Sequence, residues 1–423
     1  MHFTQWPKTI AALQSVVALL FAGCALLDPK PQFKELLTDS EYSDFILRFD
    51  FRLAPGTRGL IGLRSQFQSP ADLNATHFPG LVLSLNDDNA TTAPHDRHGS
   101  LVGVTAAMPG TLKPAGQWNT QEIRAQGRRI TVSLNGRTVV DANLNALRDP
   151  AILRNHPEVF RPRGQIVFIA RRGTLQLRNA RIAQLPRARF PNEPATHGFQ
   201  ALFNGQDLIG WQGELRRLVD YTNNPGPTLA ALTADQKATK QKEANRRMRE
   251  HWSATDGELI ANGRGDNLVT TSQFGNFELQ LDWRTSRRGA SGIFLRGQPQ
   301  VQIWDPLEGH TNAAVGSGGL YFGTNLPPVA PLRRADRAPG QWNRFRIILL
   351  GDRVHVFLND QLVLRDAQLK NYWAPGQPIP SRGPIELQNY VDPKHRLRPE
   401  DLSGSKIQGN ANRFRNIFIR ELN

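Results

Sequence analysis

The chain contains two copies of one sequence pattern, and this internal repeat constrains its fold more than any other feature. The stretch "YSDFILRFDFRLAPGTRGLIGLR" (42–64) aligns with "FGNFELQLDWRTSRRGASGIFLR" (274–296) almost position for position. Further on, Trp118 aligns with Trp342 and Asn135 with Asn359 at the same separation. A repeat of this length indicates tandem domains rather than a solenoid. We therefore predict domains at 33–186 and 199–423, joined by a linker over 187–198 that is rich in proline and charge.

Within each copy, short segments alternate apolar and polar residues and end in Gly, Asn-Gly or Asn-Asp turns, as in "VSLNGRTVV" and "VFLNDQLVL". Alternation with period two is typical of half-buried strands, and these turns are typical of hairpins. The pattern predicts an all-β protein of antiparallel sheets packed face to face, a jelly-roll or β-sandwich. One helix is expected in the second copy, over 233–251, with Thr233 and Asp235 as candidate caps. We expect it to be solvated and to pack on a sheet edge.

The first residues have the form of an export signal. Lys8 precedes an apolar run from Ile10 to Ala22, and the run ends at Gly23 and Cys24. The run is too short to span a bilayer comfortably, which indicates a secretory signal at 1–24. Cys24 lies where a bacterial lipoprotein signal places its lipidated residue, and "LFAGC" resembles a lipobox. The alternative is an ordinary signal or an uncleaved anchor. We expect an exported lipoprotein of the cell envelope, on the periplasmic or outer-membrane and cell-surface side, held to the membrane by its lipid.

Charge and cysteine content limit which partners and which covalent cross-links the chain can have. The net charge is +15, but the 52 basic residues are scattered along the chain. Their one dense cluster, at 237–250, also contains two glutamates, and no nucleic-acid motif accompanies it. We therefore expect no nucleic-acid partner. Cys24 is the only cysteine, which excludes disulfides within the chain. The oligomeric state is not encoded in any feature of this kind.

The second copy resembles the 3-keto-disaccharide hydrolase domain family. The resemblance is carried by "GFQALFNGQDLIGWQG", "SGIFLRGQPQVQIWDP", "GSGGLYFG", "YWAPGQPIPSRGPIELQ" and "FRNIFIREL", and it covers 198–423. The first copy shares only the framework. The resemblance implies two tandem concanavalin A-like jelly-roll β-sandwiches, the second with the helical insertion, in an exported bacterial protein that handles carbohydrate. It also implies cleavage of glycosides oxidised at sugar carbon 3.

One departure from the family pattern concerns a histidine. Relatives commonly follow "IELQ" with His-Gly, whereas Asn389 and Tyr390 stand here, followed by a long polar insertion. If that histidine is catalytic in relatives, its role has been lost or moved in this chain. His395, within the insertion, is a candidate replacement, although a loop histidine is more often simply solvated.

Period two also assigns the two faces of each strand in the second copy. The outward residues are predicted to be Arg296, Gln302, Trp304, Tyr321, Glu386 and Gln388. Planar amides and a guanidinium can hydrogen-bond to vicinal hydroxyls, and aromatic rings can stack on a pyranose. Asp305 and His310 are candidates for the rim of the sugar site. The alternative for Asp305 is a cap of the turn that follows, and the alternative for His310 is a solvated loop residue. In the first copy, Val167 replaces Glu386 while Arg64 matches Arg296, so the first domain keeps the scaffold without the site.

The candidate residues limit the reaction. Ordinary glycoside hydrolysis needs two carboxylates that flank the bond, and the strand with Gln302 and Trp304 supplies none within it. A 3-keto sugar needs only one base, because its carbonyl acidifies the hydrogen on carbon 2. We predict Glu386 as that base, with Arg296 or a bound cation stabilising the enolate. The alternative for Glu386 is an exposed salt bridge on a strand.

The sequence thus predicts an exported, carbohydrate-active protein whose second domain cleaves 3-keto-glycosides by hydrolysis, or by elimination and hydration. It would be an enzyme of the 3-keto-glycoside hydrolase or lyase type. The alternative is a non-catalytic module that binds carbohydrate or contacts the cell envelope. No cofactor is identified, and a divalent cation remains an open alternative.

Overall fold

The computed structural model describes residues 34–66, 78–88, 93–147, 149–186, 198–215, 232–263, 266–287, 289–305, 316–322, 326–371, 374, 376–389 and 412–422. Predictions for Cys24 and the signal at 1–24, His310 and His395 lie outside these residues. Contacts between residues divide the chain into two compact units, Met1–Pro191 and Asn192–Asn423. The division falls within the linker predicted at 187–198.

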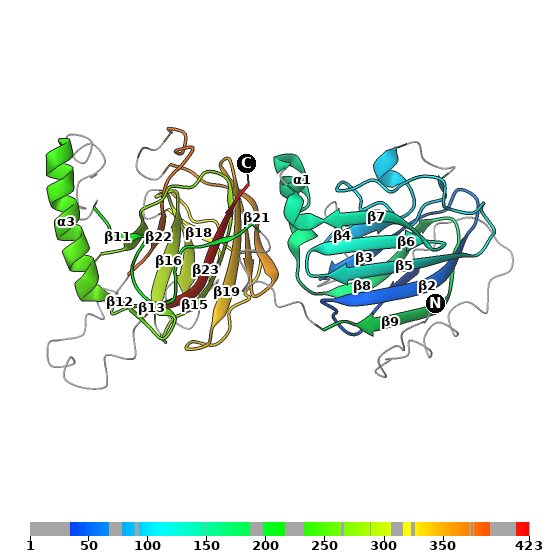
Figure 1. The fold of residues 1–423 in the computed structure, drawn as a ribbon, viewed down its shortest axis with the longest axis horizontal. Helices are drawn as coiled ribbons and strands as arrows, with labels where there is room; N and C mark the ends of the chain where they lie inside the picture. The colour runs from blue at the N-terminus through cyan, green and yellow to red at the C-terminus, as the bar shows by residue number, and fades with distance from the viewer. Residues whose placement is uncertain are drawn as a thin grey trace. The chain divides into compact units, whose positions relative to one another are not determined.

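The first unit pairs a four-stranded sheet with a five-stranded one (Figure 1). The smaller sheet has the order β1-β8-β3-β4, from Lys34–Leu37, Gln165–Arg172, Arg58–Ser65 and Leu81–Ser84. The larger has the order β7-β6-β5-β2-β9, from Arg137–Asn143, Arg129–Leu134, Asn119–Gln126, Phe45–Leu53 and Leu175–Gln184. Between β7 and β8 lie η4 (Leu144–Ala146), α1 (Pro150–Asn155) and η5 (Pro157–Phe160). A further turn, η3 (Pro94–Asp96), follows β4.

The second unit repeats this plan with a six-stranded and an eight-stranded sheet. The smaller has the order β11-β14-β22-β16-β17-β18, from Trp211–Gly213, Leu268–Thr270, Ile385–Leu387, Ala290–Leu295, Gln300–Trp304 and Leu320–Tyr321. The larger has the order β12-β13-β23-β15-β19-β20-β21, from Trp252–Thr255, Glu258–Ala261, Asn412–Glu421, Phe277–Arg284, Asn343–Leu350, Arg353–Leu358 and Gln361–Gln368. A short strand, β10 (Gln200–Ala201), also pairs with β23.

The core of the second unit lies between its two sheets. Phe277, Leu279 and Leu281 alternate along β15, and Ile293 and Val301 come from the facing sheet; all five are buried in one cluster. Burying such a side chain stabilises the fold by roughly 1.5–3 kcal/mol, so the alternating pattern fixes which face of each strand turns inward. Both units are concanavalin A-like jelly-roll β-sandwiches, and the predicted all-β fold class is confirmed.

The predicted helix is α3, Ala234–His251. Thr233 caps it in a capping box with Gln236, which satisfies two otherwise unpaired amide groups. Its inner side packs on the edge strand β11, where the Gly213 N–H donates to Asn245 Oδ1 at 2.9 Å. A Cβ on Gly213 would come within 2.2 Å of the Ala244 carbonyl oxygen, so only glycine permits this approach. The expected packing on a sheet edge is confirmed. Among the described helices, none combines the length and apolar character needed to cross a membrane.

Candidate functional site

Strand register brings predicted polar residues into one row on the outward face of the six-stranded sheet. Glu386 on β22 lies opposite Phe294 on β16, Phe294 opposite Gln300 on β17, and Gln300 opposite Tyr321 on β18. Their strand neighbours, such as Ile385, lie in the core. Because side chains alternate between faces, the four residues of the row all point away from the core.

A second row lies beside the first. Gly292 on β16 is opposite Gln302 on β17, and the Gln388 N–H donates to the Gly292 carbonyl at 2.9 Å. Trp304, two residues beyond Gln302, brings its ring centroid within 5.8 Å of that of Tyr321, with the planes tilted by 59°. The face thus combines a carboxylate, several amides and a pair of aromatic rings.

Two glutamine amides form a relay with a fixed direction. Gln302 Nε2 donates to the carbonyls of Ser291 (3.0 Å) and Ile303 (3.2 Å), which can only accept. Gln302 therefore presents Oε1 to its neighbour, and Gln300 Nε2 donates to it at 2.7 Å. The remaining Gln300 oxygen, Oε1, is buried and has no hydrogen-bond partner among the described residues. Buried acceptors are rarely left unpaired, so this oxygen is a polar group that the described part of the fold does not itself satisfy.

Gly292 makes room for the relay. A Cβ at this position would lie 2.2 Å from Gln300 Oε1. The carboxamide of Gln300 therefore packs directly over the glycine backbone, an approach that any other residue would block.

The polar row is more enclosed than the sequence suggests. Glu386 and Gln300 are each 4% exposed, and Gln302 is 8% exposed. The expectation of an open face is wrong for these three side chains, and so is an exposed salt bridge at Glu386. A carboxylate with this little exposure is uncommon on the outward face of a sheet. Such an arrangement is typical of a functional site.

Asp305 and its neighbours hold the end of β17. Asp305 is 1% exposed, and its N–H donates to the Gly289 carbonyl at 3.0 Å. The Trp304 N–H donates to Ser317 Oγ at 3.0 Å, and the Ser317 N–H in turn donates to the Asp336 carboxylate at 3.2 Å. Burial raises the pKa of Asp336. Sequence reasoning missed Ser317 and Asp336, because both lie in irregular segments where periodicity assigns no face.

The structure contradicts the predicted role of Arg296. It follows β16 with a φ of 55°, and its guanidinium donates to main-chain carbonyls, from Nε and Nη2 to Gly275 (2.9 and 2.6 Å) and from Nη1 to Gly351 (2.9 Å) and Pro380 (3.2 Å). All three nitrogens are thus engaged. Burial lowers its pKa. Arg296 is therefore a clamp that joins three segments, and it is not available to stabilise an enolate.

The first unit has the same clamp. Arg64 has a φ of 51° and donates to the carbonyls of Ser43 (2.8 Å), Gly127 (2.7 Å) and Arg161 (3.4 Å). Burial lowers the pKa of Arg64 to about 10. The occurrence of this arginine in the copy without the polar row was a sequence signal for a structural role.

The outward face of the first unit confirms that the polar row belongs to one copy. By register, Val167 on β8 lies opposite Gly62 on β3, and Gly62 opposite Val82 on β4. These positions correspond to Glu386, Phe294 and Gln300. Leu60, Val167 and Ile169 instead form a small apolar cluster, with Val82 packed against it.

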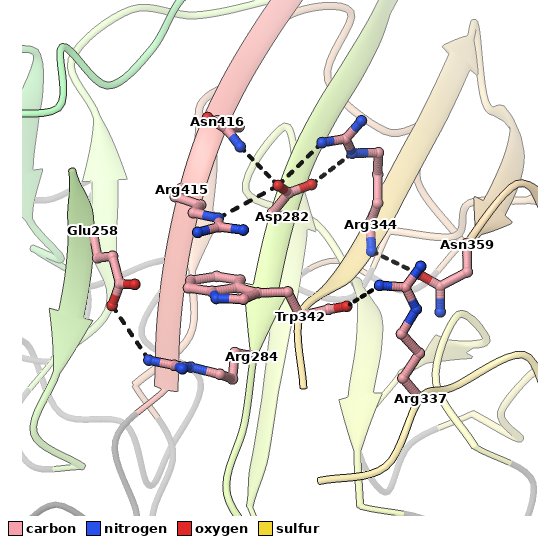
Figure 2. Close-up of polar contacts among 9 residues, drawn as sticks. All are labelled: Glu258, Asp282, Arg284, Arg337, Trp342, Arg344, Asn359, Arg415 and Asn416. Carbon is pink, nitrogen blue, oxygen red and sulfur yellow. Dashed lines mark hydrogen bonds and ion pairs between the residues drawn. The ribbon is translucent and has the colours of Figure 1, made fainter. Parts of the chain in front are cut away.

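A second polar cluster lies on the eight-stranded sheet (Figure 2). Trp342 is stacked between the guanidinium groups of Arg284 (4.8 Å) and Arg415 (4.0 Å), while Asp282 accepts hydrogen bonds from Arg344 and Asn416. Because each ring face is covered by an arginine, this tryptophan offers no platform for a sugar.

The first unit repeats this arrangement, with Trp118 between Arg52 (5.0 Å) and Arg178 (4.0 Å). The same arginine contacts in both copies indicate a structural role for both tryptophans. Across the described residues, no group of three or more His, Cys, Asp and Glu side chains is placed to hold a metal ion.

Comparison with known proteins finds a family model and a curated relative whose names both refer to the cleavage of 3-keto sugars. The model of a family described as a 3-keto-alpha-glucoside-1,2-lyase-like domain matches this chain twice, at residues 19–183 and 198–420. A curated 3-keto-disaccharide hydrolase from Bacteroides thetaiotaomicron is 24% identical over 188 residues, which are 40% of this chain and 58% of the relative. The match thus spans little more than half of that protein.

Solved structures with similar folds were also found. A putative glycosyl hydrolase from Parabacteroides distasonis is 19% identical, with a TM-score of 0.36, and the match covers 55% of this chain and 98% of that one. The carbohydrate-binding module CBM66 from Bacillus subtilis is 12% identical, with a TM-score of 0.23, and the match covers 40% and 86%.

Proposed function

The chain belongs to the 3-keto-alpha-glucoside-1,2-lyase-like domain family, and we propose that its second unit cleaves glycosides whose sugar is oxidised at carbon 3. One observation carries the proposal above all. The buried carboxylate of Glu386 shares a row with Gln300 and Tyr321, and the same row in the first unit is apolar. Two copies of one scaffold thus differ at the positions that a reaction would need.

Glu386 acts as the base in this proposal. It removes the proton on carbon 2 of the sugar and leaves the electron pair of that C–H bond in an enolate with the carbon 3 carbonyl. As the enolate collapses, that pair forms a double bond between carbons 1 and 2. The bond from carbon 1 to the glycosidic oxygen breaks, and the aglycone leaves as an alcohol after taking up a proton. Addition of water across the double bond then gives the free 3-keto sugar. Elimination alone is lyase chemistry, and elimination with hydration is a net hydrolysis.

The other residues of the face position the sugar. Gln300 Oε1 accepts a hydrogen bond from a hydroxyl group, because the relay through Gln302 leaves it an acceptor without a donor. The tilted rings of Trp304 and Tyr321 contact the apolar C–H surface of the pyranose. Arg296 is left out of this mechanism, since its donors are engaged by carbonyls. Stabilisation of the enolate would then come from another donor or a cation.

The test uses the full chain and a 3-keto-glucoside, and follows loss of the keto sugar and release of aglycone. Wild type is expected to turn over the substrate, and Glu386→Gln to reduce turnover by at least about a hundredfold, as for loss of a general base. Full activity of Glu386→Gln would refute its role as base. Saturable binding of an unoxidised oligosaccharide without turnover would instead indicate a non-catalytic carbohydrate module. Parallel assays with EDTA report on a cation.

The proposed site of action rests on the first residues of the sequence. We propose that the chain is exported and anchored in the cell envelope through a lipid on Cys24. Metabolic labelling with a radioactive fatty acid should label the wild type and not Cys24→Ala. Equal labelling of both would contradict the assignment.

A further inference from the structure

A cavity of about 610 Å³ lies in the second unit beside the Arg296 clamp. It is separate from the polar row, since none of its lining residues belongs to that row. Its lining includes Leu326, Asp352, Gln368, Lys370, Gln377 and Ile379. Its volume falls within the range of about 300–1,000 Å³ that is typical of small-molecule sites.

The duplicated clamp identifies the same place in the first unit. Arg296 Nη1 donates to the carbonyls of Gly351 and Pro380, and Arg64 Nη1 donates to those of Gly127 and Arg161. Gly351 therefore corresponds to Gly127, and the residue after each glycine can be compared directly. That residue is Asp352 in the second unit and Arg128 in the first.

A second pair of hydrogen bonds extends the correspondence. The Leu369 N–H donates to the Asp352 carbonyl at 2.7 Å, and the Leu144 N–H donates to the Arg128 carbonyl at 2.8 Å. The next residues along the chain are Lys370 and Asn145. The chain that follows these residues leads to the second carbonyl of each clamp, that of Pro380 or Arg161. The residues just before those carbonyls are Ile379 in the second unit and Phe160 in the first.

In the first unit, this place is filled by the protein itself. The guanidinium of Arg128 lies 4.3 Å from the ring centroid of Phe160, and its Nη1 donates to Asn145 Oδ1 at 3.3 Å. Arg128 is 3% exposed and Phe160 is 2% exposed. A stacked ring and guanidinium therefore plug the first unit at this position.

In the second unit, each member of the plug is replaced. Asp352 stands for the arginine, Lys370 for the asparagine and Ile379 for the phenylalanine, and all three line the cavity. The carbonyl contacts of the clamp around them are retained, although Arg64 Nη2 pairs with Asp44 at 3.3 Å where Arg296 Nη2 donates to Asn276 Oδ1 at 3.2 Å.

The connection to the second clamp carbonyl also differs: the first unit has η4, α1 and η5 before Arg161, whereas the described residues between Leu369 and Pro380 contain no helix. The space thus accompanies both the replaced plug and a shorter connection.

The lining indicates the chemistry of an occupant. Asp352 supplies acceptors, with Oδ2 already held by Gln368 Nε2 at 2.8 Å, and Lys370 supplies donors. The amide of Gln377 offers both. Asp352 Oδ1 lies 3.8 Å from Arg353 Nε, so this carboxylate is already paired. Arg296 also lines the cavity, but its donors are engaged by carbonyls, so an anion would find no free guanidinium there. Aliphatic contacts come from Leu326 and Ile379.

We propose that this cavity is a second carbohydrate site, for a neutral, hydroxyl-rich ligand of monosaccharide or disaccharide size. Mixed donors and acceptors suit hydroxyl groups, and the aliphatic wall suits the C–H face of a sugar ring. The site binds sugar without cleaving it, and its occupancy does not depend on Glu386. Its role is to hold a carbohydrate chain on the same unit that bears the polar row.

The test restores the plug of the first unit. Methyl-labelled full-length protein is titrated with maltose and with glucose, and the NMR signals of Leu326 and Ile379 are followed. Both signals are expected to shift in a saturable way in the wild type and in Glu386→Gln. Asp352→Arg combined with Ile379→Phe should fill the cavity and weaken binding at least about tenfold, as read from the Leu326 signal.

A milder variant keeps the test decisive if the double variant fails to fold. Gln377→Ala should leave the fold intact and weaken the same binding severalfold. Absence of saturable shifts in the wild type, or unchanged affinity in both variants, would overturn the proposal. The NMR readout is local to the cavity, so it is independent of the assay with the 3-keto-glucoside. Saturable shifts without turnover would support this site and refute the proposed reaction. Turnover without shifts would support the reaction and refute this site.

Discussion

Gln300 donates from Nε2 to Gln302 Oε1 at 2.7 Å, and this bond leaves Gln300 Oε1 as a buried acceptor without a donor among the described residues. We expect Gln300→Met, which preserves length and removes both polar atoms, to lower kcat/KM for a 3-keto-glucoside about tenfold, or ~1.4 kcal/mol. Gln361→Met, at the start of β21 in the other sheet, is the control and should have no effect. Equal kinetics for both variants would show that Gln300 does not contact substrate.

Gly292→Ala tests the space that the relay needs. The new methyl would meet Gln300 Oε1 at 2.2 Å and displace the carboxamide. We expect a loss of turnover comparable to that of Gln300→Met, together with a lower Tm. Gly275→Ala is the matched control, since its methyl would first meet the end of the Arg382 side chain at 3.2 Å. The interpretation fails if Gly292→Ala retains full activity.

The Arg296 clamp should matter for stability and not for chemistry. Arg296→Lys cannot span the carbonyls of Gly275, Gly351 and Pro380, and leaving buried acceptors unpaired costs about 1–3 kcal/mol. Arg64→Lys in the first unit should lower stability in the same way. Urea unfolding measures both variants, and turnover per folded molecule should remain at the wild-type level. Abolished turnover in Arg296→Lys, with the fold retained, would restore a catalytic role.

Acid stability of the first unit should depend on Asp50. Burial raises the pKa of Asp50. Hydrogen bonds from Thr120, Asn179 and Arg178 lower it by more, so the net pKa lies below the ordinary 3.8. A depressed pKa stabilises the fold above the unfolded value, and this contribution is lost as pH falls through the folded pKa. Below pH 3.8, the free energy of unfolding of Asp50→Asn should therefore fall less steeply with decreasing pH than that of the wild type. An unchanged acid limb would contradict this reading.

The cap of α3 should contribute measurably to the second unit. Thr233→Ala removes the side chain that accepts from the Gln236 N–H, at an expected cost of about 1 kcal/mol. Thr233→Ser retains the oxygen and should be close to wild type. Guanidinium unfolding monitored by circular dichroism distinguishes the two, and equal stability of both would mean that the helix is held by its packing on β11 alone.

Much of the fold follows from local pattern. The repeat gives two similar sandwiches, and period two places Ile385 in the core and Glu386 outside it, because alternate side chains of a strand must face opposite ways. The α3 helix was also predictable, since Thr233 and the charged sequence after it are local signals.

Tertiary structure decided what the local pattern could not. Arg296 and Glu386 share a face by period, yet Arg296 has a positive φ that turns it toward three carbonyls from distant segments. The direction of the Gln300 amide depends on Ser291, on another strand. The cavity at Asp352 lies where the first unit is filled by Phe160 stacked on Arg128. Periodicity fixes the side of a strand on which a residue lies, whereas its partners are set by chain segments far away in sequence.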